Sequence, residues 1–185
     1  MATTKKTTVS KPRAASSAQA TVLEPAEHTQ SAPIVAKEID IHEYITVKSG
    51  CQGKLIYKSP RTGEKFVWED FGDEQEIELQ ELKNAKSSGK KFFENNWFMF
   101  DAENDWVIDY LGLRQFYRNA LTLDNFDYLF KKNPAEMTKV IAGLSNGQKR
   151  SVAYRARQLI ESGEIDSNKA ISALEKALDT ELIER

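Results

Sequence analysis

The sequence contains very little cysteine and histidine. Its 185 residues include one cysteine, Cys51, and two histidines, His28 and His42. A single cysteine excludes an internal disulfide, which favours a reducing compartment. The spacing of these residues fits neither a zinc site nor a Cys–His nucleophile pair. We therefore interpret Cys51 as a structural residue.

The sequence also lacks the glycine-rich motifs that bind nucleotide phosphates, since neither GxGxxG nor GxxxxGK[ST] occurs. The acidic cluster Asp101–Asp105 has no central glycine of a calcium loop, and Gly112 stands where that loop needs a glutamate. The acidic residues from Asp70 to Glu78 have no adjacent nucleophile or oriented base, so we interpret them as a charged strand edge. We predict no catalytic residues, no metal and no cofactor, and expect a protein that is not an enzyme.

Long hydrophobic runs are missing as well. The apolar runs fall far short of the roughly 20 residues that cross a bilayer. The first residues are basic but lack the apolar stretch of a secretory signal. The net charge of −2 argues against a protein built mainly to bind nucleic acid. We expect no membrane association.

Residues 1–37 contain no aromatic residue and are rich in Thr, Ser, Ala, Lys, Pro and Gln. Such a segment cannot bury enough apolar surface to offset the entropy of ordering, so we predict a disordered tail. The alternative is an arm that orders on a partner. The net charge of +3 on this segment would attract the arm to such a partner, mainly through Lys5, Lys6, Lys11 and Arg13.

Aromatic residues gather instead in the middle of the chain. Thirteen of the eighteen, including all three tryptophans, lie between Tyr57 and Tyr117. Residues 38–120 combine β-prone runs with short helical patterns, which predicts a small α+β unit with an antiparallel sheet. This is also the acidic part, because residues 38–121 contain eleven basic and sixteen acidic side chains. Neutral or basic surfaces are its expected partners.

Four runs in this unit favour strands by their composition and alternation: 44–47, 55–58, 65–68 and 75–79. Between the second and third, Pro60 pre-sets a turn and Gly63 relieves its exit, which predicts a hairpin. A helix is predicted from Leu79 through Lys86. The runs 97–100 and 106–108 indicate either another hairpin or a strand leading into a helix over 111–120.

Residues 121–185 carry helical signals, which predict a bundle of short helices after the β-rich unit. Asn133 and Pro134 are typical of a helix start, and an earlier helix is predicted over 124–132. Ser145 and Gln148 have the spacing of a capping box. That helix should end at Gly163, and Asp166 or Ser167 should begin the last one. Apolar residues then repeat at helical spacing in each segment, for example Ile171, Leu174, Leu178 and Leu182.

One helix, over residues 148–158, is basic and gives an alternative function as a nucleic-acid-binding regulator. Its candidate contacts are Lys149, Arg150, Arg155 and Arg157. Lys149 and Arg150 lie in the first turns, where cations oppose the helix dipole, so they are candidates for serving a partner. Arg155 and Arg157 are two residues apart and cannot share one narrow helix face. We favour a solvated helix or a protein contact.

Several stretches of the middle unit carry a resemblance to a known group of proteins: 53–58, 62–64, Trp68, 71–74, 79–85, 92–93 and 96–97. With these stretches, residues 44–113 resemble small structural proteins encoded among the virion genes of tailed bacteriophages. The resemblance implies a non-enzymatic virion subunit of the head, neck or tail, or an assembly factor, made in the host cytoplasm. Its implied partners are other virion subunits in a homo- or hetero-oligomeric assembly.

Four aromatic residues are candidate contacts for such partners: Trp68, Phe71, Trp97 and Trp106. Large aromatic side chains often anchor protein interfaces because they bury much area at little entropic cost. The competing interpretation of each is a core residue. The sequence thus predicts a protein that acts through contacts with other proteins.

Overall fold

The alternation of apolar and polar residues builds a three-stranded antiparallel sheet. In the computed structural model, which describes residues 39–183, strands β1 (Tyr44–Ser49), β4 (Glu74–Glu78) and β5 (Phe98–Met99) pair in the order β4-β1-β5. Ile45 lies opposite Ile77, and both are completely buried. The predicted disordered tail, residues 1–37, lies outside the described residues.

A separate hairpin forms where the sequence predicts one. Strands β2 (Leu55–Lys58) and β3 (Lys65–Trp68) are antiparallel, with Tyr57 opposite Phe66. In the turn, the hydroxyl of Ser59 accepts hydrogen bonds from two backbone amides, and Gly63 adopts a φ of +77°. A residue with a Cβ is strained at that φ, so the glycine is required by the turn.

Helices α1 (Leu79–Ser88) and α2 (Lys91–Glu94) lie between β4 and β5 in the chain, and α1 includes the helix predicted from Leu79 through Lys86. Of the two alternatives for this segment, the second hairpin is wrong, because residues 106–108 belong to helix α3 (Trp106–Tyr110) after the short turn η1 (Ala102–Asn104). Val107, Ile108 and Leu111 are all buried, which is a helical spacing that a strand would split between two faces. The helix expected over 111–120 is only α4 (Arg114–Tyr117), since Gly112 turns the chain at a φ of +66°.

The C-terminal part contains α5 (Leu123–Phe126), the 3-10 turn η2 (Asp127–Lys131), α6 (Pro134–Ala142), α7 (Asn146–Glu161) and α8 (Asn168–Leu178). The helix starts at Asn133 and Ser145 are confirmed, because each side chain accepts a backbone amide hydrogen bond three residues on. The reciprocal half of the predicted capping box is not made. Gln148 instead bonds the backbone of Leu121, 27 residues away.

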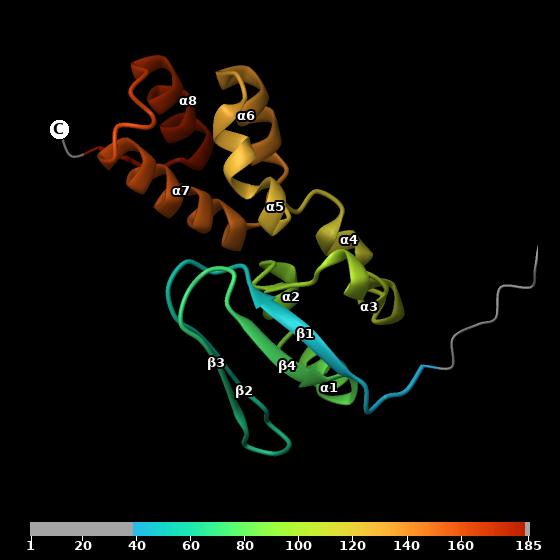
Figure 1. Ribbon diagram of the computed structural model, residues 1–185. Helices are drawn as coiled ribbons and strands as arrows, with labels where there is room; N and C mark the ends of the chain where they lie inside the picture. The colour runs from blue at the N-terminus through green and yellow to red at the C-terminus, as the bar shows by residue number, and fades with distance from the viewer. Residues whose placement is uncertain (1–38, 184–185) are drawn as a thin grey trace, which may run out of the picture. The chain divides into compact units, whose positions relative to one another are not determined.

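Buried side chains form two hydrophobic clusters. The first joins both sheets to α1, α2 and α3 and extends from Ile45 to Leu113. The second joins α5 to α8 and extends from Phe126 to Leu182. Figure 1 shows α5 to α8 gathered together, with the strands and the shorter helices grouped beside them. The α+β class is confirmed, with antiparallel strands followed by packed helices.

Candidate functional site

Helix α7 is anchored on the β-rich part by contacts between residues far apart in the sequence. The hydroxyl of Ser145 donates to the Asn95 carbonyl at 3.1 Å, and that of Ser151 donates to the Gly50 carbonyl at 2.8 Å. Gly147 leaves no space for a side chain, because a Cβ there would lie 2.2 Å from the Asn95 carbonyl oxygen. The start of α7 is therefore packed directly against the chain around Asn95.

This docking leaves a groove of about 360 Å³ beside α7, which we call the α7 groove. One wall comes from the loop after β1 and from the residue that precedes β5; the other comes from α7 itself. Its main lining side chains are Cys51, Gln52, Trp97, Arg150, Tyr154 and Arg157. Tyr154 is 49% exposed, so an aromatic ring with a hydroxyl is presented at the rim.

A second hollow, of about 270 Å³, adjoins the α7 groove. It shares Arg150, Ala153 and Thr180 with the groove and adds Lys149. Residues 149, 150, 153, 154 and 157 recur at helical spacing, so they occupy one face of α7. The structure thus places Trp97 in one groove with Arg150 and Arg157, and Lys149 in the adjoining hollow.

The fourth basic residue lies elsewhere. Arg155 donates to both carboxylate oxygens of Asp127, at 3.0 and 2.7 Å, beside a different hollow that contains Asp70 and Phe71. The hydrogen bonds from Arg155 hold the pKa of Asp127 below its usual value. The two arginines at 155 and 157 accordingly serve different faces, as their spacing predicts.

The charged groups lining the α7 groove and its adjoining hollow are all cationic among the residues described. Within the described part of the chain, Lys149 and Arg150 form no ion pair, and Arg157 donates to the backbone carbonyl of Glu181 at 3.0 Å. Burial raises the pKa of the Cys51 thiol, although the nearby charge of Arg150 opposes that rise. A neutral thiol is a weaker nucleophile than a thiolate.

The other aromatic candidates differ in their accessibility. Trp68 is corrected to a core residue, because it is completely buried and its indole nitrogen donates to the Val47 carbonyl at 2.9 Å. Phe71 packs against Phe126, with ring centroids 4.5 Å apart, and Trp106 lies 6.1 Å from Tyr110. Phe71, Trp97 and Trp106 each retain partial exposure.

The acidic run between residues 70 and 78 is held by local partners. Glu74 pairs with Lys48, Glu76 accepts from Thr46, and Glu78 contacts His42. These residues lie on β4, at the edge of the three-stranded sheet. Before β4, Asp70 accepts hydrogen bonds from the backbone amides of Gly53 and Phe71, and Asp73 accepts one from the amide of Glu69. Within residues 39–183, no group of three or more His, Cys, Asp or Glu side chains is arranged to hold a metal.

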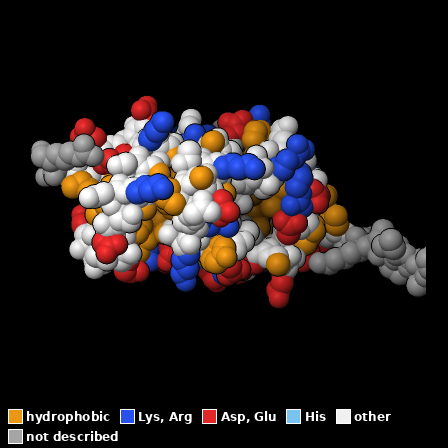
Figure 2. Space-filling view, turned by 90° about the horizontal axis from the view of Figure 1, so that it is seen from above, with side chains coloured by type: hydrophobic (Ala, Val, Ile, Leu, Met, Phe, Trp, Pro, Cys, Tyr) orange, Lys and Arg blue, Asp and Glu red, His pale blue; other side chains and the backbone are white. Residues whose placement is uncertain are grey.

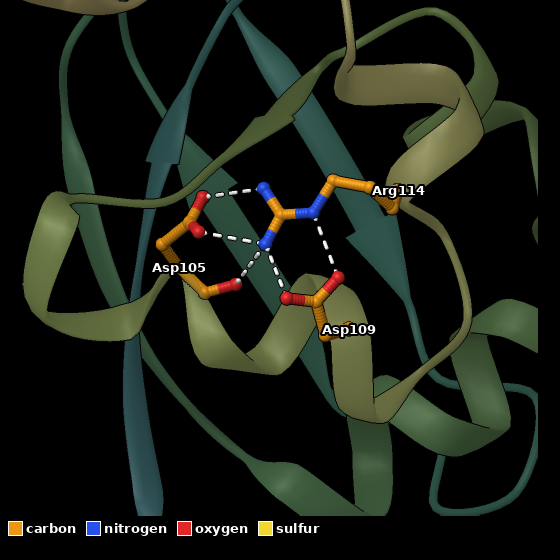
Figure 3. A network of polar contacts seen from close by, with 3 residues as sticks. All are labelled: Asp105, Asp109 and Arg114. Carbon is orange, nitrogen blue, oxygen red and sulfur yellow. Dashed lines mark hydrogen bonds and ion pairs between the residues drawn. The ribbon is translucent and has the colours of Figure 1, made fainter. Parts of the chain in front are cut away.

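Sequence reasoning missed a charged cluster that joins α3 to α4 (Figure 3). The guanidinium of Arg114 lies between Asp105 and Asp109 and donates to both carboxylates, at 2.6 to 3.0 Å. Hydrogen bonds from Arg114 lower the pKa of Asp109. The two aspartates are four residues apart, which is a helical spacing that could have indicated the cluster.

A buried polar pair was missed as well. The hydroxyl of Tyr57 donates to Glu81 at 2.6 Å, and Asn84 donates to the other carboxylate oxygen at 3.3 Å. Glu81 is only 4% exposed. Burial is the main cause of the raised pKa of Tyr57, and the hydrogen bond to Glu81 raises this pKa further. The sequence offers little sign of the pair, because the partners are 24 residues apart on different elements.

Comparisons of this chain with protein-family models, with curated proteins and with solved structures found no match. In the part of the chain that the structure describes, no helix is both long and apolar enough to span a membrane. The α7 groove is therefore judged on its own chemistry.

Proposed function

We propose that this chain is a non-enzymatic structural subunit or assembly factor of a tailed-phage particle, which acts by binding neighbouring proteins. The observation that carries the binding role is the α7 groove, where Trp97, Tyr154, Arg150 and Arg157 line one hollow. Aromatic and arginine side chains are the residue types that dominate protein interfaces. The phage context rests on the resemblance of residues 44–113.

Particle composition tests this proposal directly. Purified particles and the lysate of infected cells are analysed for this chain by quantitative mass spectrometry. A structural subunit should stay with the particles through a density gradient in a constant ratio to the other subunits. An assembly factor should be found in immature particles and decline in mature ones. Its presence in the lysate together with its absence from particles of every stage would contradict the proposal.

A nucleic-acid-binding role is the second candidate, because Lys149, Arg150 and Arg157 lie on one face of α7. Arg155 contributes less to this alternative, since its guanidinium is already paired with Asp127. Phosphate contacts release counterions, so retention of DNA should fall steeply with salt. The alternative predicts that Arg150→Ala weakens retention on a filter more than Arg155→Ala does. Absence of retention at low salt would remove it.

A further inference from the structure

We propose that the α7 groove and its adjoining hollow bind an acidic segment of a neighbouring protein. Its carboxylates would contact Lys149 in the hollow and Arg150 and Arg157 in the groove, and an apolar side chain would lie against Trp97 and Tyr154. This inference rests on the proposed function and names the chemistry of the partner. It follows from charge, from the energetics of helix α7, and from the extent of the basic surface.

The charge of the groove differs from that of the protein as a whole. The chain has a net charge of −2, yet the charged side chains that line the two adjoining hollows are cations within the described residues. Figure 2 shows acidic and basic side chains intermingled over one face of the molecule. A hollow with charges of one sign therefore attracts a partner of the opposite sign and disfavours others.

The position of the cations on α7 is unfavourable for the helix itself. Lys149 and Arg150 are the fourth and fifth residues of α7, close to the positive end of its dipole. In the described part of the chain, neither has a carboxylate partner that would compensate. An acidic ligand would supply that compensation.

The basic surface is also short. From Lys149 to Arg157 the helix advances by only about 12 Å. The next hollow, which Arg157 also lines, contains Glu161 and Glu181. A continuous phosphate backbone would meet these carboxylates, but a short acidic segment fits before them. The groove also offers aromatic surface from Trp97 and Tyr154, on which an apolar side chain can lie.

Fluorescence anisotropy on the full chain tests the assignment. The probe is a labelled synthetic peptide in which glutamates flank one phenylalanine, and its matched control carries glutamine for each glutamate. The double variant Lys149→Gln with Arg150→Gln removes two cations and adds no unfavourable interaction with the helix dipole. We expect this variant to bind the glutamate peptide about three- to tenfold more weakly than wild type does, which is the effect of losing two exposed charge contacts. Added salt should weaken wild-type binding in the same direction.

The control variant is Arg61→Gln with Lys65→Gln, which removes the same charge from exposed positions of the β2–β3 hairpin. Figure 1 shows the turn of this hairpin directed away from α7. The control should bind as wild type does. Thermal unfolding followed by circular dichroism confirms that both variants are folded. Equal binding by the α7 variant and wild type, or equal binding of the two peptides, would overturn the inference.

Two further measurements distinguish an acidic peptide from the other possible occupants of the groove, which are nucleic acid and a second copy of the chain. If single-stranded DNA of matched charge binds more tightly than the peptide and loses affinity in the same α7 variant, the groove binds nucleic acid and the inference fails. If the chain self-associates by light scattering and the α7 variant is monomeric, the occupant is a second copy. Failure of the peptide with the chain still present in particles refutes only this inference. Absence from particles of every stage refutes the proposed function.

Discussion

Gly147 is the position where a single methyl group should have the largest effect on how α7 is anchored. The change is Gly147→Ala, which leaves every other side chain intact. An alanine Cβ would lie 2.2 Å from the Asn95 carbonyl oxygen, 2.6 Å from the Asn95 Cβ and 2.8 Å from the Trp97 indole nitrogen. Because the first contact is with backbone, no side-chain rotation can relieve it.

The expected magnitude follows from two opposing effects. Carbon atoms pack at about 3.5–4.0 Å, so the chain around Asn95 and the start of α7 must separate by about 1 Å. Overpacking of this kind costs about 1–3 kcal/mol. Alanine is better than glycine inside a helix by up to about 1 kcal/mol, which offsets part of the loss. We expect a net destabilisation of about 1–2 kcal/mol.

Urea unfolding followed by circular dichroism measures this effect. With a slope of about 1–3 kcal/mol per molar urea, the midpoint should fall by roughly 0.5–1 M. Gly143→Ala is the matched control. Its φ of −86° suits alanine, and its nearest atoms would lie at 3.5 and 3.6 Å, an ordinary contact distance. That variant should be neutral or slightly more stable. A midpoint for Gly147→Ala equal to or above that of Gly143→Ala would refute the close-packing argument.

Replacing Arg114 by methionine should lower the melting temperature, because both carboxylates that it joins would lose their common donor. The wild-type advantage should shrink in high salt, since these groups are exposed; a salt-independent difference would contradict it. Tyr57→Phe should cost about 1–3 kcal/mol in a urea titration, because Glu81 would lose its shortest hydrogen bond while buried. An unchanged midpoint would show that Glu81 finds another donor. The hydrogen bond with Glu78 raises the pKa of His42, so its stabilisation is complete below the unfolded value of about 6.5 and disappears as pH rises through the folded pKa. Glu78→Gln should lower the pKa of His42 in an NMR titration, and an unmoved pKa would refute the pairing.

The hairpin turn and the starts of two helices were predicted correctly from neighbouring residues. The β2–β3 hairpin follows from two β-prone runs and from a turn containing Pro60 and Gly63. The starts of α6 and α7 follow from Asn133 and Ser145, because a helix cap needs only an acceptor three residues before an amide. These features depend on atoms that the chain places close together whatever the rest of the fold does.

The errors arose where two patterns competed over a short segment. Residues 106–108 are apolar and follow an acidic turn, which suits a strand, but Leu111 completes a helical face with Val107 and Ile108. Strand β5 pairs with the end of β1. Among the described strands, no later strand pairs with β5 to form a second hairpin. Length and local composition do not distinguish these outcomes for runs of this size.

The sequence by itself determined the α+β class, the β2–β3 hairpin and the starts of α6 and α7, because those depend on residues within a few positions of one another. The tertiary structure alone decided that Trp68 is core and that Gln148 bonds Leu121. The tertiary structure also formed the α7 groove, through two long-range hydrogen bonds. Their partners are separated in the sequence by 50 positions in one case and by 101 in the other. Contacts at that separation depend on how whole elements pack, and no local pattern of residues encodes them.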